Sequence, residues 1–179
     1  MHRLFVALRP PVPIRETLFA IMHGVEGARW QSDDQIHCTL RFIGEVDRHQ
    51  AEDIAAALAR VTAIPFDLAL SSVGTFDRRG RIDTLWAGIT PHDAVAALHA
   101  RVDRACINAG CASEHRAYLP HITLARLNRA SGPLHAFLAA NAGLSSAPFP
   151  VTEFGLYESI LGSEGPVYHL AERYPLTPR

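Results

Sequence analysis

The sequence predicts an α+β fold that is bilobal, with two pseudo-twofold-related halves. Antiparallel-rich sheets are expected around a central cleft, with the helices on the outside. Three observations lead to this prediction: strand-like and helix-like apolar patterns alternate along the chain, one short motif occurs twice, and the segments around that motif repeat in the same order. With 179 residues, of which 48% are hydrophobic, the chain suits one domain spanning residues 1–179.

The first half, roughly residues 1–80, is predicted to contain three strands and two helices. Residues 3–8 are an apolar run typical of a buried strand. Pro13 suits the first turn of a helix that continues to about Glu26. Asp47 can cap a second helix that continues through Val61. The other two strands are predicted at 37–43, ending at Gly44, and at 66–76.

The second half, roughly residues 81–179, is predicted to begin with a hairpin. Its turn is Arg78-Arg79-Gly80-Arg81, where contact with an RNA backbone is conceivable but a solvated tip is favoured. The helices of this half are expected at 93–109, ending near Gly110, and at about 134–140. Its strands are expected at 83–89, 113–118, 121–127, 151–161 and 167–174.

The repeated motif is His-x-Thr-Leu, at His37-Cys38-Thr39-Leu40 and at His121-Ile122-Thr123-Leu124. Residues 4–8 match residues 85–89 at an offset of 81, the motifs match at 84, and Pro65 matches Pro148 at 83. These nearly constant offsets predict an internal duplication. A pseudo-twofold arrangement of the two halves places their histidines on opposite walls of one cleft.

The motif also predicts chemistry. Successive side chains of a strand alternate between its faces, so each histidine shares a face with the threonine two positions on, while the intervening residue points into the core. Imidazole has an ordinary pKa of about 6.5, so one histidine can accept a proton while the other delivers one. That pair is sufficient for cleaving a phosphodiester without a metal.

Composition excludes several other classes. All 17 basic residues are arginine, which excludes mechanisms that use a nucleotidyl-lysine or a P-loop lysine. A net charge of −1 predicts local rather than global contact with nucleic acid.

The three cysteines lack Cys-x-x-Cys spacing and are expected to be reduced thiols. No signal peptide or membrane span is expected, so a cytoplasmic location is predicted. A monomer is expected, because two halves already supply the twofold site.

The segments around the motifs resemble the two-histidine phosphoesterase superfamily, and within it the RNA 2′,3′-cyclic phosphodiesterases, also called 2′-5′ RNA ligase-like proteins. The segments that carry the resemblance are Arg3–Leu8, Trp30 with Ile36–Val46, Arg116–Arg126, and Leu156–Ser159 through Tyr168. The resemblance implies hydrolysis of a terminal 2′,3′-cyclic phosphate to a 2′-phosphomonoester, with no metal or other cofactor. It also implies that His37 is the proton donor and His121 the proton acceptor, roles that the sequence symmetry alone leaves open.

Five further residues are candidates for substrate binding. Thr39 and Thr123 can donate hydrogen bonds to the non-bridging phosphate oxygens. Arg41 has the strand parity of His37 and could face the cleft or be an edge residue. Arg126 has the opposite parity to His121, so only a bulge or the strand end brings it to the phosphate. Tyr118 could stack on a base or position the second motif.

Three alternatives stay open at this stage. The same site could act on another cyclic phosphodiester, such as a small cyclic nucleotide or ADP-ribose 1″,2″-cyclic phosphate, or join RNA ends through a 2′-5′ linkage. The chain could bind RNA ends without chemistry. A two-histidine metal site is disfavoured, because no carboxylate or cysteine stands at ligand spacing beside either motif. The remaining histidines are expected at the surface; they are His2, His23, His49, His92, His99, His115, His135 and His169.

Overall fold

The computed structural model describes residues 1–114, 116–163 and 165–177. Its strands are β1 (His2–Leu8), β2 (Arg29–Trp30), β3 (Cys38–Val46), β4 (Phe66–Asp77), β5 (Ile82–Thr90), β6 (His121–Arg126), β7 (Phe149–Val151), β8 (Glu153–Gly162) and β9 (Gly165–Pro175). Its helices are α1 (Val12–Ile21), α2 (Arg48–Leu58), α3 (His92–Asn108) and α4 (His135–Asn141), with a short 3₁₀ helix at Asp33–Gln35. One predicted surface residue, His115, lies outside the described residues.

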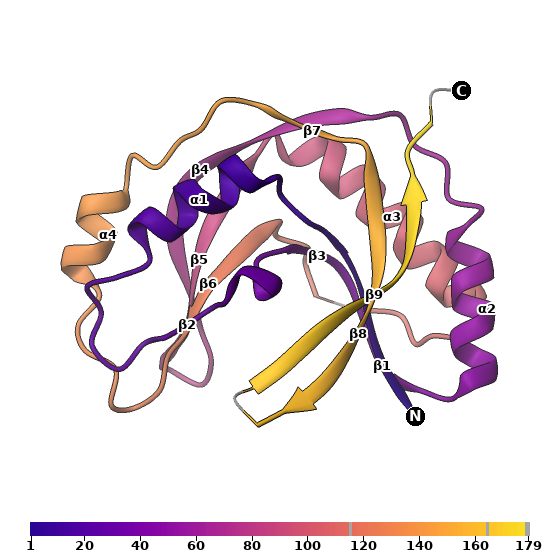
Figure 1. The fold of residues 1–179 in the computed structure, drawn as a ribbon, viewed down its shortest axis with the longest axis horizontal. Coiled ribbons are helices and arrows are strands. Elements are labelled where there is room, and N and C mark those ends of the chain that lie inside the picture. The colour runs from indigo at the N-terminus through magenta and orange to yellow at the C-terminus, as the bar shows by residue number, and fades with distance from the viewer. Residues whose placement is uncertain (115, 164, 178–179) are drawn as a thin grey trace.

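The strands form a curled antiparallel sheet in the order β7-β4-β5-β6-β3-β1-β8-β9, with β2 beside β6 (Figure 1). The two motif strands, β6 and β3, are the central neighbours in this order. They are joined through the residue pair Cys38 and Ile122. The α+β class, with antiparallel pairing and helices outside, is therefore confirmed.

The two lobes of the sheet do not correspond to the two halves of the chain. In one lobe β4, from the first half, pairs with β5. In the other lobe β8, from the second half, pairs with β1. The order β4-β5-β6 thus corresponds to β8-β1-β3, so that β4 and β8, the fourth strand of each half, are exchanged between the lobes. A boundary near residue 80 therefore separates two halves of the sequence, but each lobe of the sheet contains strands from both halves. The internal duplication stays a prediction.

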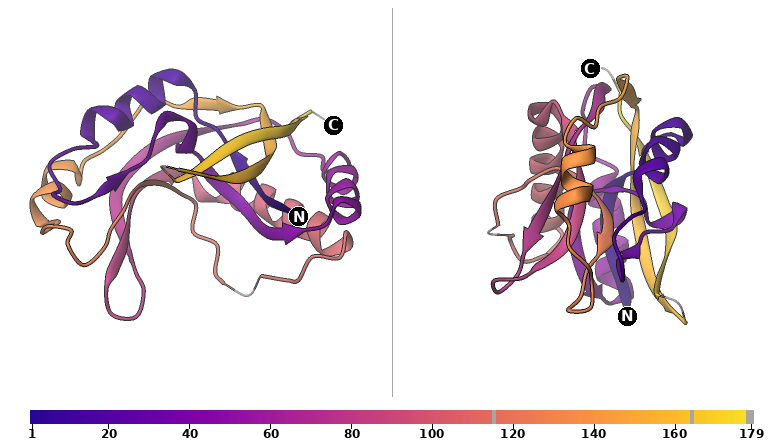
Figure 2. Two further views of the ribbon diagram at one scale, coloured as in Figure 1. Left: turned by 60° about the horizontal axis from the view of Figure 1, so that its bottom comes forward. Right: turned by 90° about the vertical axis from the view of Figure 1, so that its left-hand side faces the viewer.

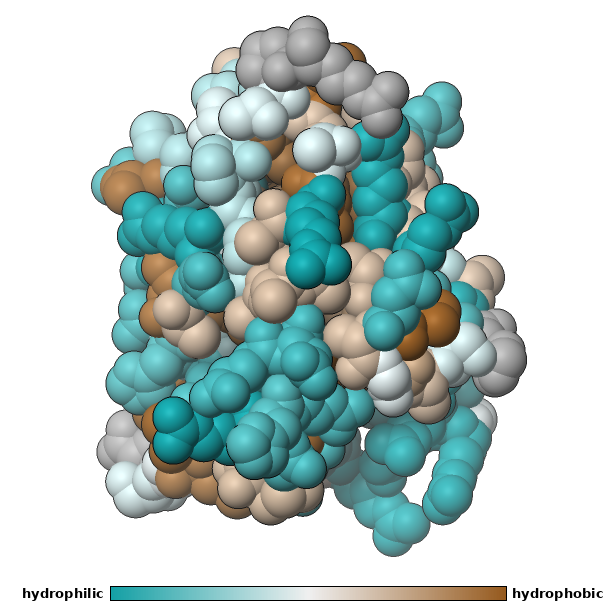
Figure 3. Space-filling model, turned by 90° about the vertical axis from the view of Figure 1, so that its right-hand side faces the viewer, coloured by the Kyte–Doolittle hydropathy of each residue, from teal (hydrophilic) through white to brown (hydrophobic). Residues whose placement is uncertain are grey.

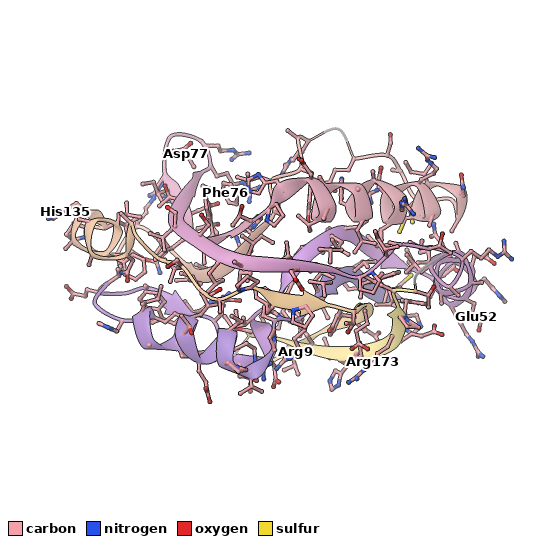
Figure 4. The ribbon with its side chains drawn as sticks, turned by 90° about the horizontal axis from the view of Figure 1, so that it is seen from above. Arg9, Glu52, Phe76, Asp77, His135 and Arg173 are labelled. Atoms are coloured by element: carbon pink, nitrogen blue, oxygen red, sulfur yellow. The ribbon has the colours of Figure 1, made fainter. Side chains whose placement is uncertain are left out.

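The helices cover opposite faces of the sheet. Helix α1 lies on one side and α3 on the other (Figures 2 and 4). Each turns an apolar stripe inward, and the buried residues are Ile14 and Leu18 in α1, Ile54 and Leu58 in α2, and Val95, Leu98, Val102 and Cys106 in α3. Hydrophilic and near-neutral residues cover most of the face around α2 (Figure 3). In the part of the chain that the structure describes, no helix is long and apolar enough to cross a membrane.

Several elements differ from the sequence prediction: α2 ends at Leu58 rather than Val61, and the strand expected at 151–161 is divided into β7 and β8. Two other differences are larger. Helix α1 ends at Ile21 rather than near Glu26, because Gly24 adopts a φ of 80°, a left-handed conformation that breaks a helix. The predicted strand at 113–118 is wrong, since residues 112–114 and 116–120 have no regular structure. No free edge is available beside the motif strand there, because β6 already pairs with β5 on one side and with β3 and β2 on the other. Asp47 caps α2 as predicted, accepting a 2.9 Å hydrogen bond from the amide of Gln50.

Candidate active site

The two motifs meet where β3 and β6 pair. Because Cys38 and Ile122 are antiparallel partners, the chain direction places His37 across from Thr123 and Thr39 across from His121. Cys38 and Ile122 are 2% and 0% exposed and point into the core. The histidines and threonines therefore share the opposite face, and directly opposed side chains on such a face have Cβ atoms about 5 Å apart. The two motifs therefore lie side by side on one face of the sheet, whereas the sequence predicted histidines on opposite walls of a cleft.

Both histidines are held in the same way. Nδ1 of His37 donates to the carbonyl of Gln35 at 2.8 Å, and Nδ1 of His121 donates to the carbonyl of Leu119 at 2.7 Å. A carbonyl only accepts, so each neutral ring carries its proton on Nδ1 and leaves Nε2 as the reactive nitrogen. Nε2 of His37 lies 3.0 Å from the hydroxyl oxygen of Thr39. Each Nε2 can accept a proton when the ring is neutral and donate one when it is charged.

Aromatic rings pack around each histidine. The ring centroid of Phe5 lies 4.9 Å from that of His37, and the centroid of Tyr168 lies 5.4 Å away with its ring nearly perpendicular to the imidazole. The ring centroids of Phe76 and His121 are 4.7 Å apart with the rings nearly perpendicular, and the centroid of Trp86 is 6.2 Å from that of His121. These aromatic neighbours were not among the sequence candidates. Two of them could have been found from the sequence, since Phe5 and Trp86 occupy equivalent positions when residues 4–8 are aligned with residues 85–89.

Burial lowers the pKa of both histidines. For His37 the loss of hydration lowers the pKa to about 4, opposed by the hydrogen bond to Gln35 and reinforced by the positive charges of His121 and Arg126. For His121 the loss of hydration is again the first cause of a lowered pKa, opposed by the bond to Leu119 and reinforced by Arg126. Near neutral pH the site therefore favours two neutral imidazoles, and a bound anion would raise the pKa of either ring.

A bulge in β6 decides the position of Arg126. Its strand pairs Ala125 with Leu85 and Thr123 with Trp86, which leaves Leu124 as an extra residue. Leu124 and Ala125 are both buried, so the alternation of faces shifts by one residue. Arg126 consequently lines the same cavity as His121 and donates from Nη1 to the Thr84 hydroxyl at 2.8 Å. The bulge that the sequence analysis required for Arg126 to reach the phosphate is therefore present.

An equivalent bulge in β3 has the opposite effect on Arg41. The pairs Val6–Arg41 and Ala7–Thr39 leave Leu40 as the extra residue. Arg41 is consequently 5% exposed and turned away from the histidine face. Its Nε lies 3.1 Å from Oδ1 of Asp103, and its Nη1 donates to Oε2 of Glu114 at 2.8 Å. The prediction that Arg41 faces the cleft is therefore wrong, because the bulge reverses the simple alternation.

Tyr118 is a positioning residue in this geometry. Its hydroxyl donates to the carbonyl of Thr39 at 3.0 Å, and burial raises its pKa, which keeps the hydroxyl protonated. Its ring stacks on that of His99 at 3.9 Å with a 4° interplanar angle, so one face is already occupied. Nδ1 of His99 donates to the carbonyl of Leu40 at 2.6 Å. The expectation that His99 is only a surface group is wrong: together with Tyr118 it binds two carbonyls at the β3 bulge.

A cavity of about 760 Å³ opens on the side of His121. Its lining includes Thr39, Tyr118, His121 and Arg126 from the motif region and Phe76 from β4. His37 faces a narrower space lined by Arg9, Phe5, Asp34, Tyr157 and Tyr168. Figure 4 shows Phe76 near the tip of the β4–β5 hairpin and Arg9 beside α1, on the other side of the sheet. Among the residues described, no group of three or more His, Cys, Asp or Glu side chains is placed to hold a metal.

Replacing Gly74 tests the wall beside His121. A Cβ at this position would lie 2.3 Å from Cζ2 of Trp86, the cross-strand partner of Gly74. We expect Gly74→Ala to displace the indole, to lower the free energy of unfolding by about 1–3 kcal/mol, and to shift the tryptophan fluorescence. Gly143→Ala is the control, because its Cβ meets nothing within 4 Å. Equal effects of the two substitutions would contradict the tight Gly74–Trp86 contact.

Comparison with known proteins agrees with this architecture. Residues 11–162 match the model of the 2′-5′ RNA ligase superfamily. The chain belongs to this superfamily. A Geobacillus stearothermophilus protein named RNA 2′,3′-cyclic phosphodiesterase is 31% identical over 82% of this chain, but the match spans only 47% of that relative. An Archaeoglobus fulgidus protein of the same name is 28% identical over 93% of this chain and 96% of its own length.

Among solved structures, a crystal structure of Escherichia coli LigT in complex with 3′-AMP is similar in fold. It has a TM-score of 0.79 and 27% sequence identity, and the match covers 99% of each chain. This structural match therefore extends over the whole curled sheet, whereas the superfamily model, at residues 11–162, includes both motif strands but not β1 or β9.

Proposed function

We propose that this protein hydrolyses RNA terminal 2′,3′-cyclic phosphates to 2′-phosphomonoesters by paired histidine acid–base catalysis, without a metal. The observation that carries the proposal is the face shared by His37, Thr39, His121 and Thr123, with each Nδ1 bound to a carbonyl and each Nε2 left to react. The names of the superfamily relatives, RNA 2′,3′-cyclic phosphodiesterase, support the same reaction.

The proposed step is an in-line displacement at phosphorus. Nε2 of His121 accepts a proton from the attacking water while the oxygen–phosphorus bond forms. The bond from phosphorus to O3′ breaks, and Nε2–H of His37 delivers a proton to the departing oxygen. The hydroxyls of Thr39 and Thr123 and the guanidinium of Arg126 donate to the non-bridging oxygens, whose charge must be stabilised in the transition state. The assignment of acid to His37 and base to His121 rests on the family resemblance.

The lowered pKa values of both histidines predict an acidic pH optimum for kcat/KM. Catalysis in this scheme needs one neutral and one protonated ring, and kcat/KM reports the free enzyme. With the pKa of His37 at about 4 and that of His121 also below 6.5, we expect a bell-shaped profile centred below pH 6.5. The measurement is kcat/KM from pH 4 to 8 at constant ionic strength. An optimum above pH 7 would contradict the effect of burial on the two rings.

The reaction is tested with a short RNA ending in a 2′,3′-cyclic phosphate, incubated with protein treated with a chelator. A product bearing only a 2′-phosphate, formed at an unchanged rate after chelation, is the expected result. A 3′-phosphate product or loss of activity on chelation would overturn the proposed chemistry. Turnover only of small cyclic nucleotides, formation of 2′-5′ linked RNA, or binding without cleavage would each favour one of the alternative uses of this site.

A further inference from the structure

The cavity beside His121 continues away from the motif strands. Besides His121 and Arg126, its lining includes Arg78 and Arg79 at the tip of the β4–β5 hairpin and Arg116 in the loop between α3 and β6. Figure 2 shows the hairpin and this loop projecting from the same side of the molecule. One continuous space therefore connects the proposed phosphate site with three further arginines from two separate segments.

The lining of this space carries four arginines, Arg78, Arg79, Arg116 and Arg126, against three carboxylates. Each carboxylate keeps its charge but already has a partner of its own: Asp77 accepts from the amide of Gly80 at 3.0 Å, Asp83 from the Thr84 hydroxyl at 2.8 Å, and Glu114 from Arg41. Within residues 1–114, 116–163 and 165–177, no carboxylate lies within 4.0 Å of the guanidinium groups of Arg78, Arg79 and Arg116. These three guanidinium groups are thus available to an external anion.

The hairpin tip adds a second observation. Arg79 has a φ of 56°, a left-handed conformation that disfavours side chains other than Asn, Asp and Gly. The side chain of Arg79 thus lines the cavity although the left-handed backbone at this position is unfavourable for arginine. The aromatic residue Phe42, which is 48% exposed, also lines the cavity, and the guanidinium of Arg3 lies over its ring at 5.5 Å from the centroid. Cations combined with exposed aromatic rings are how proteins hold single-stranded nucleic acid.

We infer that this arginine-lined extension, formed by Arg78, Arg79 and Arg116, binds the internucleotide phosphates of an RNA strand on the 5′ side of its cyclic end. The substrate class is therefore an oligonucleotide rather than a mononucleotide. This inference rests on the proposed function of the histidine pair, because that pair fixes where the cyclic end lies. The low net charge of −1 agrees with a grip on a few nucleotides only.

The test compares a tetranucleotide ending in a 2′,3′-cyclic phosphate with the matching nucleoside 2′,3′-cyclic phosphate. The variants are Arg78→Gln, Arg116→Gln and Arg79→Asn, asparagine being chosen because it tolerates the left-handed backbone. Arg81→Gln is the matched control, since it removes one charge from the same hairpin at a residue that does not line the cavity. Circular dichroism and the thermal midpoint confirm that each variant is folded.

We expect a higher kcat/KM for the tetranucleotide in the wild type. Each of the three substitutions should lower that value roughly two- to fivefold, as for a solvent-exposed ion pair, with less than a twofold change for the mononucleotide. The logarithmic salt dependence should lose a slope of about 0.7 for each phosphate contact removed. Arg81→Gln should change neither quantity.

Equal kcat/KM for the two substrates, or an equal loss in Arg81→Gln, would overturn the inference while leaving the proposed function intact. If neither substrate is cleaved, the proposed function fails instead. Fluorescence anisotropy with a labelled tetranucleotide ending in a 2′-phosphate then decides the inference separately. Weaker binding in the three variants, but not in Arg81→Gln, supports it, and unchanged binding overturns it.

Discussion

Replacing either motif histidine with alanine should lower kcat/KM for cyclic phosphate-ended RNA by roughly 10²–10⁴-fold, while the protein stays folded. The physical reason is that each Nε2 handles a different proton in the same displacement, so neither ring can replace the other. The fold should tolerate the changes, because both side chains are half-buried: His121 lines the large cavity and His37 the narrower space beside it, and neither belongs to the core. The double variant should lose little more than each single variant, as expected for residues that act as a unit.

A sulfur-substituted substrate separates the two roles. If the departing 3′ oxygen is replaced by sulfur, the leaving thiolate no longer needs a proton from the enzyme. The variant that lacks the acid should then regain activity, whereas the variant that lacks the base should not. Rescue of His37→Ala alone is expected. Rescue of His121→Ala alone would reverse the roles, and wild-type turnover in either variant with the ordinary substrate would refute acid–base catalysis by this pair.

Replacing Arg41 with alanine should lower the free energy of unfolding by about 3 kcal/mol, because it leaves a buried network without its cation. Arg41 is 5% exposed and connects β3 to Asp103 on α3 and to Glu114 and the carbonyl of Ala112 in the following loop. The measurement is chemical denaturation of both proteins. At temperatures where the variant is folded, kcat/KM should change by less than about threefold, since the side chain points away from the histidine face.

Arg48→Ala provides the matched comparison. It also removes an arginine from an ion pair, with Glu52 one helical turn away, but the Arg48 side chain is 82% exposed. Its effect on unfolding should stay within about 0.5 kcal/mol. If Arg41→Ala instead leaves stability unchanged and removes activity, the side chain belongs to the cleft, as simple strand alternation predicts.

The motif and its faces could be read from the sequence because they depend on local geometry alone. Alternation along a strand places His37 with Thr39 and His121 with Thr123, whatever the rest of the fold does. The apolar residues between them, Cys38 and Ile122, are buried as that alternation requires. The α+β class follows from similarly local periodicities, which β- and α-forming segments must satisfy to bury one face.

Beyond the four residues of each motif, the simple alternation of side chains along a strand no longer predicts which face a residue occupies. Bulges at Leu40 and Leu124 arise only when β3 pairs with β1 and β6 pairs with β5. They exchange the expected positions of two arginines, turning Arg41 into the interior and bringing Arg126 to the cleft. The role of His99 could not be predicted from the sequence for a related reason: its partners, Leu40 and Tyr118, are distant from it in the sequence.

The sequence by itself determined the reactive groups of this protein: two His-x-Thr pairs, each with a face and a strand of its own. Only the tertiary structure decided which strands become neighbours, and therefore that the two pairs share one face at Cys38 and Ile122. The physical reason is that side-chain direction is set within a few residues by backbone geometry. Pairing and bulges, by contrast, depend on hydrogen bonds between segments that approach one another only when the sheet forms.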